Sequence, residues 1–176
     1  MKYSIDLSLV TNPSDEIGAY WRGYLLKKAY IDKNRTRVRV SLPKVDAGHI
    51  FLLLSDLRSN IVPRKIKRNI NGIPYIGIYT NINSKDLIRL LNNLGVDNRH
   101  YIRGIFDACG IITNNRNYLR IGCHDTEFLN IIPWKNKSGW WVGNEAVKVL
   151  RYLYVDSSRY MESKINKVLK YIIKPT

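Results

Sequence analysis

Three arginines at alternate positions, Arg35, Arg37 and Arg39, could bind phosphate or base edges from one face of a β-strand. Successive side chains of a strand point to opposite faces, so this spacing puts the three guanidinium groups on one face and Val38 and Val40 on the other. A guanidinium group makes two-pronged contacts with phosphate or guanine. The pattern predicts a strand with one packed face and one nucleic-acid-binding face; an ordinary solvated strand face is the alternative.

A second basic cluster indicates that a neighbouring strand is also cationic. Its members are Arg64, Lys65, Lys67 and Arg68. The cluster precedes Asn71-Gly72 and an apolar run at 73–79, which predicts a hairpin whose first strand is basic, with an exposed basic loop as the alternative. Further basic side chains that we predict to contact nucleic acid are Lys28, Arg116, Arg120, Lys135 and Lys137.

The charge of the whole chain indicates the same kind of partner. The 176 residues carry a formal net charge of +15, and the sequence pI is about 9.9. Thirteen of the 29 Lys and Arg residues lie between positions 22 and 68, where only three acidic residues occur. A surplus of this size favours an anionic polymer as partner, and nucleic acid is the first candidate.

Two segments of the chain are similar to each other, which predicts an internal duplication. Residues 101–110 read YIRGIFDACG and residues 20–29 read YWRGYLLKKA, so that Gly23 and Gly104 are 81 positions apart. A repeat of this length predicts two similar units whose first helices pack on each other across a pseudo-twofold axis. The ends of those helices would then bring residues of both halves to one site.

Both segments resemble the motif of the LAGLIDADG homing endonuclease family, a helix with Gly at its third position, an acid at the eighth and Gly at the ninth. Gly104 and Gly110 occupy the glycine positions of the second copy, whereas the first copy keeps Gly23 and has Ala29 at the ninth position. The resemblance implies an α+β fold in which two pseudo-symmetric αββαββα halves form a saddle on double-stranded DNA. It also implies that these three glycines pack the motif helices together.

In that family the eighth motif position carries the carboxylate that binds the catalytic metal ions. Lys28 and Cys109 stand there in this chain. Mg²⁺ prefers oxygen ligands, and neither an ammonium nor a thiol replaces one, so we expect a nuclease-inactive protein that needs no cofactor. Mg²⁺ would be needed only if the chain were an active endonuclease. Asp107, at the sixth position, is a candidate residual ligand, with support of the helix end or core as its alternative.

The element order expected from the sequence follows two halves, 1–96 and 97–176. In the first half we predict helices near 14–28, 47–59 and 85–94, with strands at the basic segments between them. In the second half we predict the motif helix, strands near 111 and 118–123, a short helix at 127–131, a strand hairpin within 134–142, and helices at 147–154 and 158–172. The spacing of Ala146, Leu150, Tyr160 and Lys164 also resembles the tail of many family members.

Other features limit the possible functions. No run of about 18 apolar residues and no signal peptide occur, so we expect an intracellular protein that does not contact a membrane. The internal pseudo-twofold symmetry predicts a monomer, and the high Asn, Ile and Lys content suggests that a phage, a bacterium or an organelle encodes it. Cys109 and Cys123 lack metal-ligand spacing and are expected to be reduced thiols, without a zinc site. The isolated histidines show no catalytic spacing.

Three functions fit these observations. The first is a double-stranded DNA-binding protein of the homing endonuclease type that has lost both motif carboxylates. The second is an active endonuclease or nickase that uses other acids, such as Asp32 or Asp107. The third is RNA binding, as an intron maturase or a component of a ribonucleoprotein, because a basic saddle can also accept helical RNA.

Overall fold

The structure is a computed structural model, and it describes residues 6–11, 15–32, 37–70, 72–80, 99–115 and 118–173. The predicted helix at 85–94 and the predicted boundary between residues 96 and 97 lie outside these ranges. Among the described residues, no helix is long and apolar enough to cross a membrane.

The first half begins with the short helix α1 (Ser8–Thr11), which the sequence did not predict, followed by the motif helix α2 (Glu16–Lys28). Asp15 caps α2 by accepting a hydrogen bond from the Gly18 N–H at 2.9 Å. The elements that follow are β1 (Tyr30–Asp32), β2 (Arg37–Pro43), the 3-10 turn η1 (Lys44–Asp46), α3 (Ala47–Asp56), β3 (Arg64–Ile70) and β4 (Ile73–Thr80). Helix α3 ends earlier than predicted because Arg58 adopts a φ of 46°, which terminates the helix.

The strands of the first half form one antiparallel sheet in the order β1-β2-β4-β3. Strands β3 and β4 pair as the predicted hairpin, and Gly72 adopts the positive φ of 78° that its turn needs. In β2, Val38, Val40 and Leu42 are buried against α2 and α3, whereas Arg39 points to the opposite side. The predicted division of this strand into a packed and an open face is confirmed at these residues.

The second half is built from seven elements in a similar order. They are α5 (Arg99–Cys109), β5 (Ile111–Asn115), β6 (Tyr118–Gly122), α6 (Thr126–Ile131), β7 (Trp140–Val142), α7 (Asn144–Tyr154) and α8 (Glu162–Ile172). Strands β5, β6 and β7 form an antiparallel sheet in that order. Leu119, Ile121 and Trp141 are buried beneath α5 and α7, so one face of this sheet is packed as well.

The predicted hairpin within 134–142 is wrong, because only its second strand, β7, forms. Asn136 closes a local turn instead: its side-chain oxygen accepts hydrogen bonds from the Ser138 N–H at 2.9 Å and the Ser138 hydroxyl at 2.7 Å. Trp134 packs edge-on against Tyr152 of α7, and its carbonyl accepts a hydrogen bond from the Trp141 indole at 3.1 Å. These contacts tie the segment to α7 and to β7 without making it a strand of the sheet.

The predicted helix at 158–172 begins later, at Glu162, because the preceding segment is bound to the first half. The Ser158 N–H donates to Glu16 at 2.8 Å, and Arg159 makes a two-pronged contact with Asp56 at 2.7 and 2.9 Å. Met161 is buried in the core of the first half. An extended strap therefore crosses from the second half to the first before α8 starts.

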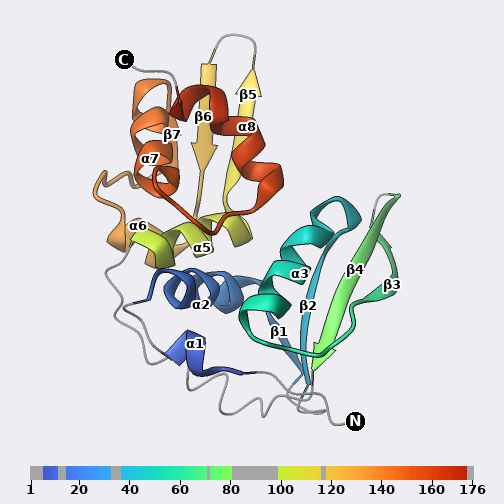
Figure 1. Cartoon of the computed structure of the whole chain (residues 1–176). Helices are drawn as coiled ribbons and strands as arrows, with labels where there is room; N and C mark the ends of the chain where they lie inside the picture. The colour runs from blue at the N-terminus through green and yellow to red at the C-terminus, as the bar shows by residue number, and fades with distance from the viewer. Residues whose placement is uncertain are drawn as a thin grey trace.

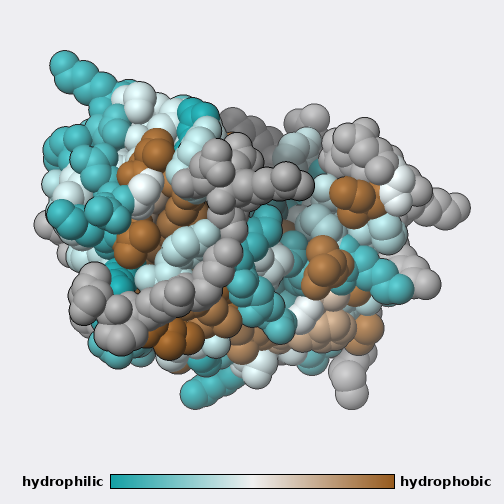
Figure 2. Space-filling model, turned by 90° about the horizontal axis from the view of Figure 1, so that it is seen from above, coloured by the Kyte–Doolittle hydropathy of each residue, from teal (hydrophilic) through white to brown (hydrophobic). Residues whose placement is uncertain are grey.

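Two hydrophobic cores lie on either side of the paired helices α2 and α5, which cross at the centre of the molecule (Figure 1). Helix α3 covers the first sheet, and α7 and α8 lie over the second (Figure 1). In the view from above, hydrophilic residues cover much of the surface and hydrophobic residues form separate patches among them (Figure 2). The α+β class and the arrangement in two halves are confirmed.

Candidate nucleic-acid interface

The motif helices α2 and α5 touch at their glycines. A Cβ added at Gly104 would lie 2.1 Å from the Tyr20 carbonyl oxygen, and a Cβ added at Gly23 would lie 2.0 Å from the Tyr101 carbonyl oxygen. The two backbones therefore approach each other where a side chain cannot fit. At Gly110, which follows α5, an added Cβ would instead lie 2.5 Å from the Phe106 ring of the same helix, so this contact is not one between the two motif helices. Gly23 and Gly104 lie in the packing positions that the resemblance implied.

The ends of the two motif helices meet, and they carry an ammonium and a thiol. Lys28 is the last residue of α2, and its Nζ donates to the Ala108 carbonyl oxygen near the end of α5 at 3.5 Å. Burial lowers the pKa of Lys28. Cys109, the last residue of α5, is exposed, and its Sγ lies 3.9 Å from the Sγ of Cys123. The pKa of Cys109 is lowered, chiefly by the hydrogen bond from the Cys123 thiol.

A second ammonium, which the sequence analysis did not assign to the site, lies beside these groups. Lys164 of α8 donates to the carbonyl oxygens of Phe106 and Gly110, the latter at 2.8 Å. Burial lowers its pKa to about 8. The positive charge also suits the negative end of the α5 dipole. Lys28 and Lys164 therefore give a positive charge to the centre, by which we mean the place where the ends of α2 and α5 meet. The resemblance places two carboxylates in this part of the fold.

Asp107 lies in the core and holds the two halves together. It is 1% exposed and accepts hydrogen bonds from the hydroxyl groups of Tyr20 at 2.8 Å and Tyr154 at 2.5 Å, and from the Met161 N–H at 2.7 Å. Burial raises its pKa, while Lys164 and these donors act in the opposite direction. Both carboxylate oxygens are thus used inside the protein, in the supporting role that was the alternative to metal binding.

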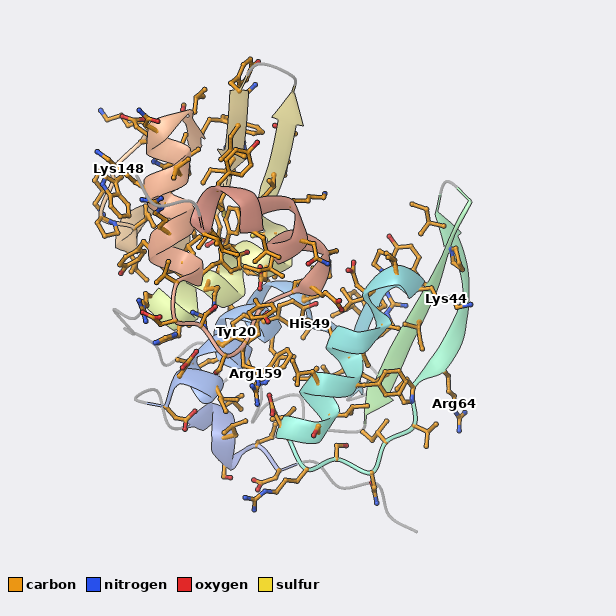
Figure 3. The ribbon with its side chains drawn as sticks, turned by 45° about the horizontal axis from the view of Figure 1, so that its top comes forward. Tyr20, Lys44, His49, Arg64, Lys148 and Arg159 are labelled. Carbon is orange, nitrogen blue, oxygen red and sulfur yellow. The ribbon has the colours of Figure 1, made fainter. Side chains whose placement is uncertain are left out.

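A neutral histidine completes this buried network. The Tyr20 hydroxyl lies 2.9 Å from Nε2 of His49, and burial lowers the pKa of His49 to about 4. Figure 3 shows Tyr20 and His49 together at the centre, between α2 and α3. The histidine, which the sequence left without a role, is a packed partner of the tyrosine.

The residues at the helix ends do not fit a magnesium ion, because Lys28 carries a positive charge and Cys109 offers a thiol. Within the described ranges, no group of three or more His, Cys, Asp or Glu side chains could hold a metal ion. Asp125, whose charge acts on Cys109, contacts Lys27 at 2.8 Å, and Glu127 lies 3.8 Å from the same lysine. Asp32 is at the end of β1, and its side chain is outside the described part.

Two of the basic residues predicted on the first sheet lie on its open face. Arg39 of β2 stacks over the ring of Tyr30 at 4.9 Å, and Tyr30 is 59% exposed. Arg64 of β3 is exposed and pairs with Gly77 of β4, and Gly77 pairs with Ser41 of β2. Ser41 lies two residues from Arg39, so Arg64 and Arg39 share one face of the sheet. Figure 3 shows Arg64 at the outer side of this sheet, pointing away from the core. The open face of the first sheet is therefore cationic.

Other basic residues predicted to bind nucleic acid cannot be placed in the same detail. Arg35 and Arg116 lie outside the described residues, and the side chains of Arg37, Lys65, Lys67 and Arg68 lie outside the described part of their strands. Lys135 and Lys137 are exposed in the loop before β7. Lys135 donates to the carbonyl oxygens of Leu129 and Asn130, so α6 positions it.

Arg120 of β6 occupies the position in the second half that corresponds to Arg39, because the two are 81 residues apart, as Gly23 and Gly104 are. Its guanidinium group lies 3.9 Å from the centre of the Trp140 ring, and its Nε is buried with no hydrogen-bond partner among the described residues. The shared offset of 81 residues could have identified Arg39 and Arg120 as equivalent positions in the two halves. The aromatic partner on β7 was missed because no local pattern in the sequence shows that β7 pairs with β6.

No protein-family model matches the sequence, and no curated protein matches it. The chain is similar to the crystal structure of the N-terminal LAGLIDADG domain of DUF199/WhiA, with 15% identity, a TM-score of 0.47, and 96% of this chain and 87% of that chain covered. It is also similar to full-length DUF199/WhiA from Thermatoga maritima, with 15% identity, a TM-score of 0.48, and 97% and 66% of the two chains covered. Because the identity is 15% and both TM-scores are below 0.5, neither similarity indicates what this chain binds.

Proposed function

We propose that this chain is a double-stranded DNA-binding protein of the homing endonuclease type that holds the duplex without cutting it. The observation that carries the proposal is the open face of the first sheet, which presents Arg39 and Arg64, while Val38, Val40 and Leu42 fill the packed side. The net charge of +15 supports an electrostatic interaction with phosphates. The chain would act as a monomer, because its two halves supply the pseudo-twofold symmetry.

The centre between the motif helices favours binding without cleavage. Lys28 stands at one of the two motif positions where the resemblance implies a metal-binding carboxylate, and Lys164 adds a second ammonium group near it. Asp107 is occupied in the core. An ammonium pair repels divalent cations and attracts phosphate, so this centre is suited to hold the backbone in place. The endonuclease alternative would need carboxylates from elsewhere, such as Asp32.

The proposal is tested by measuring the affinity for a duplex of random sequence at several salt concentrations. Arg39→Ala and Arg64→Ala should each weaken binding and reduce the slope of log affinity against log salt by about one. Lys148→Ala is the matched control. Lys148 is exposed on α7, at the far side of the molecule from Arg64, so removing its charge should leave the slope nearly unchanged (Figure 3).

Two further results bear on the proposal. If Arg39→Ala weakens binding to all DNA sequences equally, Arg39 contacts phosphate. If it relaxes the base preference at a single position of the site, Arg39 reads base edges in the groove. Recovered DNA incubated with Mg²⁺ or Mn²⁺ should be enriched without new ends. Site-specific new ends would show that the chain cuts DNA, and equal slopes for Arg39→Ala, Arg64→Ala and Lys148→Ala would contradict the proposed interface.

A further inference from the structure

Among the described side chains, the open face of the second sheet carries one arginine, Arg120, whereas that of the first carries two, Arg39 and Arg64. Alternation along the strands puts Leu119 and Ile121 in the core and turns their neighbours outward. The outward-facing residues with described side chains are Ile111, Thr113, Tyr118, Arg120, Trp140 and Val142. Apart from Arg120 and Thr113 these side chains are apolar or aromatic, whereas the first face presents Arg39 and Arg64 beside Tyr30 and Ile73.

The apolar residues of this face remain open to solvent. Ile111 is 45% exposed, Tyr118 46% and Val142 47%. The strand register places Arg120 of β6 between Thr113 of β5 and Val142 of β7. Tyr118 lies two residues before Arg120 on the same strand and therefore on the same face. Large apolar side chains that share one sheet face and stay exposed mark an interaction surface rather than scattered surface residues.

Trp140 and Arg120 form a flat stacked pair on this face. A Cβ added at Gly122 would lie 2.5 Å from the Trp140 ring, so the ring lies directly over the glycine. The Arg120 guanidinium is 3.9 Å from the ring centre, and the edge of His124 packs on the same ring at 5.4 Å between centroids. Within the part of the chain that the structure describes, the Nε of Arg120 has no hydrogen-bond partner. A planar cation fixed on an indole is therefore presented next to an exposed tyrosine.

We infer that this face binds the unpaired bases of a single-stranded nucleic acid. Aromatic rings and guanidinium planes on a sheet are surfaces on which exposed bases stack, whereas the bases of a duplex are stacked on one another and unavailable. The charge of the chain favours a polyanion over an apolar protein segment. Tyr118 stacks one base, and the Arg120–Trp140 pair stacks or hydrogen-bonds its neighbour.

This inference goes beyond duplex binding and assigns a separate surface to it. The first sheet binds duplex through charge, and the second sheet binds unpaired bases through stacking, so a chain with both surfaces can bind the junction between a duplex and a single strand. The stacking chemistry is the same for DNA and RNA. The two sources differ only in sugar and backbone, and oligothymidylate and oligouridylate distinguish them.

The test compares binding of fluorescein-labelled oligothymidylate, oligouridylate and a duplex to the full chain at one salt concentration. Tyr118→Ala should weaken binding of the preferred oligonucleotide roughly 5- to 100-fold, and Tyr118→Phe, which keeps the ring, should bind within about twofold of the unmodified chain. Duplex affinity should stay within about twofold for both variants. Because Tyr118 is half exposed, thermal unfolding should confirm that the variants are folded.

Intrinsic fluorescence supplies a second readout. Trp21 and Trp141 are buried and Trp134 packs on Tyr152, so an oligonucleotide bound to the open face should quench Trp140, and Trp140→Phe should remove most of the quenching. Arg64→Ala should weaken duplex binding and leave oligonucleotide binding nearly unchanged. Duplex binding that fails while oligonucleotides still bind would refute the proposed function alone.

Three outcomes would overturn the inference. The first is no oligonucleotide binding at a salt concentration where the duplex binds. The second is unchanged oligonucleotide affinity in Tyr118→Ala. The third is an equal loss of duplex and oligonucleotide binding in that variant, which would make Tyr118 part of one undivided duplex surface.

Discussion

Replacing Gly104 by alanine should loosen the contact between the motif helices. The added methyl carbon would lie 2.1 Å from the Tyr20 carbonyl oxygen and 2.8 Å from the Tyr24 nitrogen, whereas ordinary van der Waals contacts begin at 3.4 Å. Both neighbours are backbone atoms of α2, so no side chain can rotate away. The helices must instead separate by roughly 1 Å, which disturbs the packing on both sides of the interface.

The magnitude follows from two opposing effects. Overpacking a close helix contact costs about 1–3 kcal/mol or somewhat more, and alanine returns up to about 1 kcal/mol through its higher helix propensity. We therefore expect Gly104→Ala to lower the free energy of unfolding by about 2 kcal/mol, which corresponds to a fall in Tm of about 4–8 °C for a chain of this size. Urea and thermal unfolding, followed by circular dichroism, measure both quantities.

Gly48→Ala is the matched control for this substitution. Gly48 lies in the first turn of α3, and a Cβ added there would meet nothing within 4 Å. The same change should leave stability unchanged or raise it by up to about 1 kcal/mol. If Gly104→Ala were as stable as Gly48→Ala, the close backbone contact of α2 and α5 would be wrong.

Three further predictions concern the buried network and the thiols. Asp107→Asn should lower the free energy of unfolding by about 1–3 kcal/mol, because an amide cannot accept from all three donors; unchanged urea unfolding would contradict the bridging role. The unfolded chain takes up a proton on His49 near pH 6.5, and the folded chain does so only at about 4, so stability should fall by roughly 3 kcal/mol as the pH drops from 7 to 4. In His49→Gln this component of the pH dependence of stability should be missing. A pH profile of stability identical to that of the unmodified chain would refute the assignment to His49. Iodoacetamide should label exposed Cys109 well before buried Cys123, as peptide mass spectrometry can show; equal rates would contradict the described exposure.

The sequence predicted those features that depend on a local pattern. The offset of 81 residues placed Gly23 and Gly104 in one interface, and the alternation around Arg39 gave the correct packed face of β2. Both signals are carried by neighbouring residues or by a repeat. They need no knowledge of distant contacts.

Features that depend on partners far apart in the chain could not be predicted in this way. Lys164 reaches carbonyl groups of α5 that precede it by more than fifty residues, and nothing in its own spacing distinguishes it from a surface lysine. Asp107 bridges Tyr20 and Tyr154 only because the two halves pack together. Trp134 leaves the expected hairpin because α7 offers it an aromatic partner.

The salt dependence of duplex binding tests the central claim most directly. With six to ten basic side chains on phosphates, affinity for a random-sequence duplex should fall linearly on logarithmic axes, by about 10³- to 10⁵-fold between 50 and 200 mM salt. The slope should be shallower in Arg64→Ala and unchanged in Lys148→Ala. No binding at 50 mM salt, or an affinity that does not respond to salt, would contradict the claim that this chain binds double-stranded DNA through its cationic sheet.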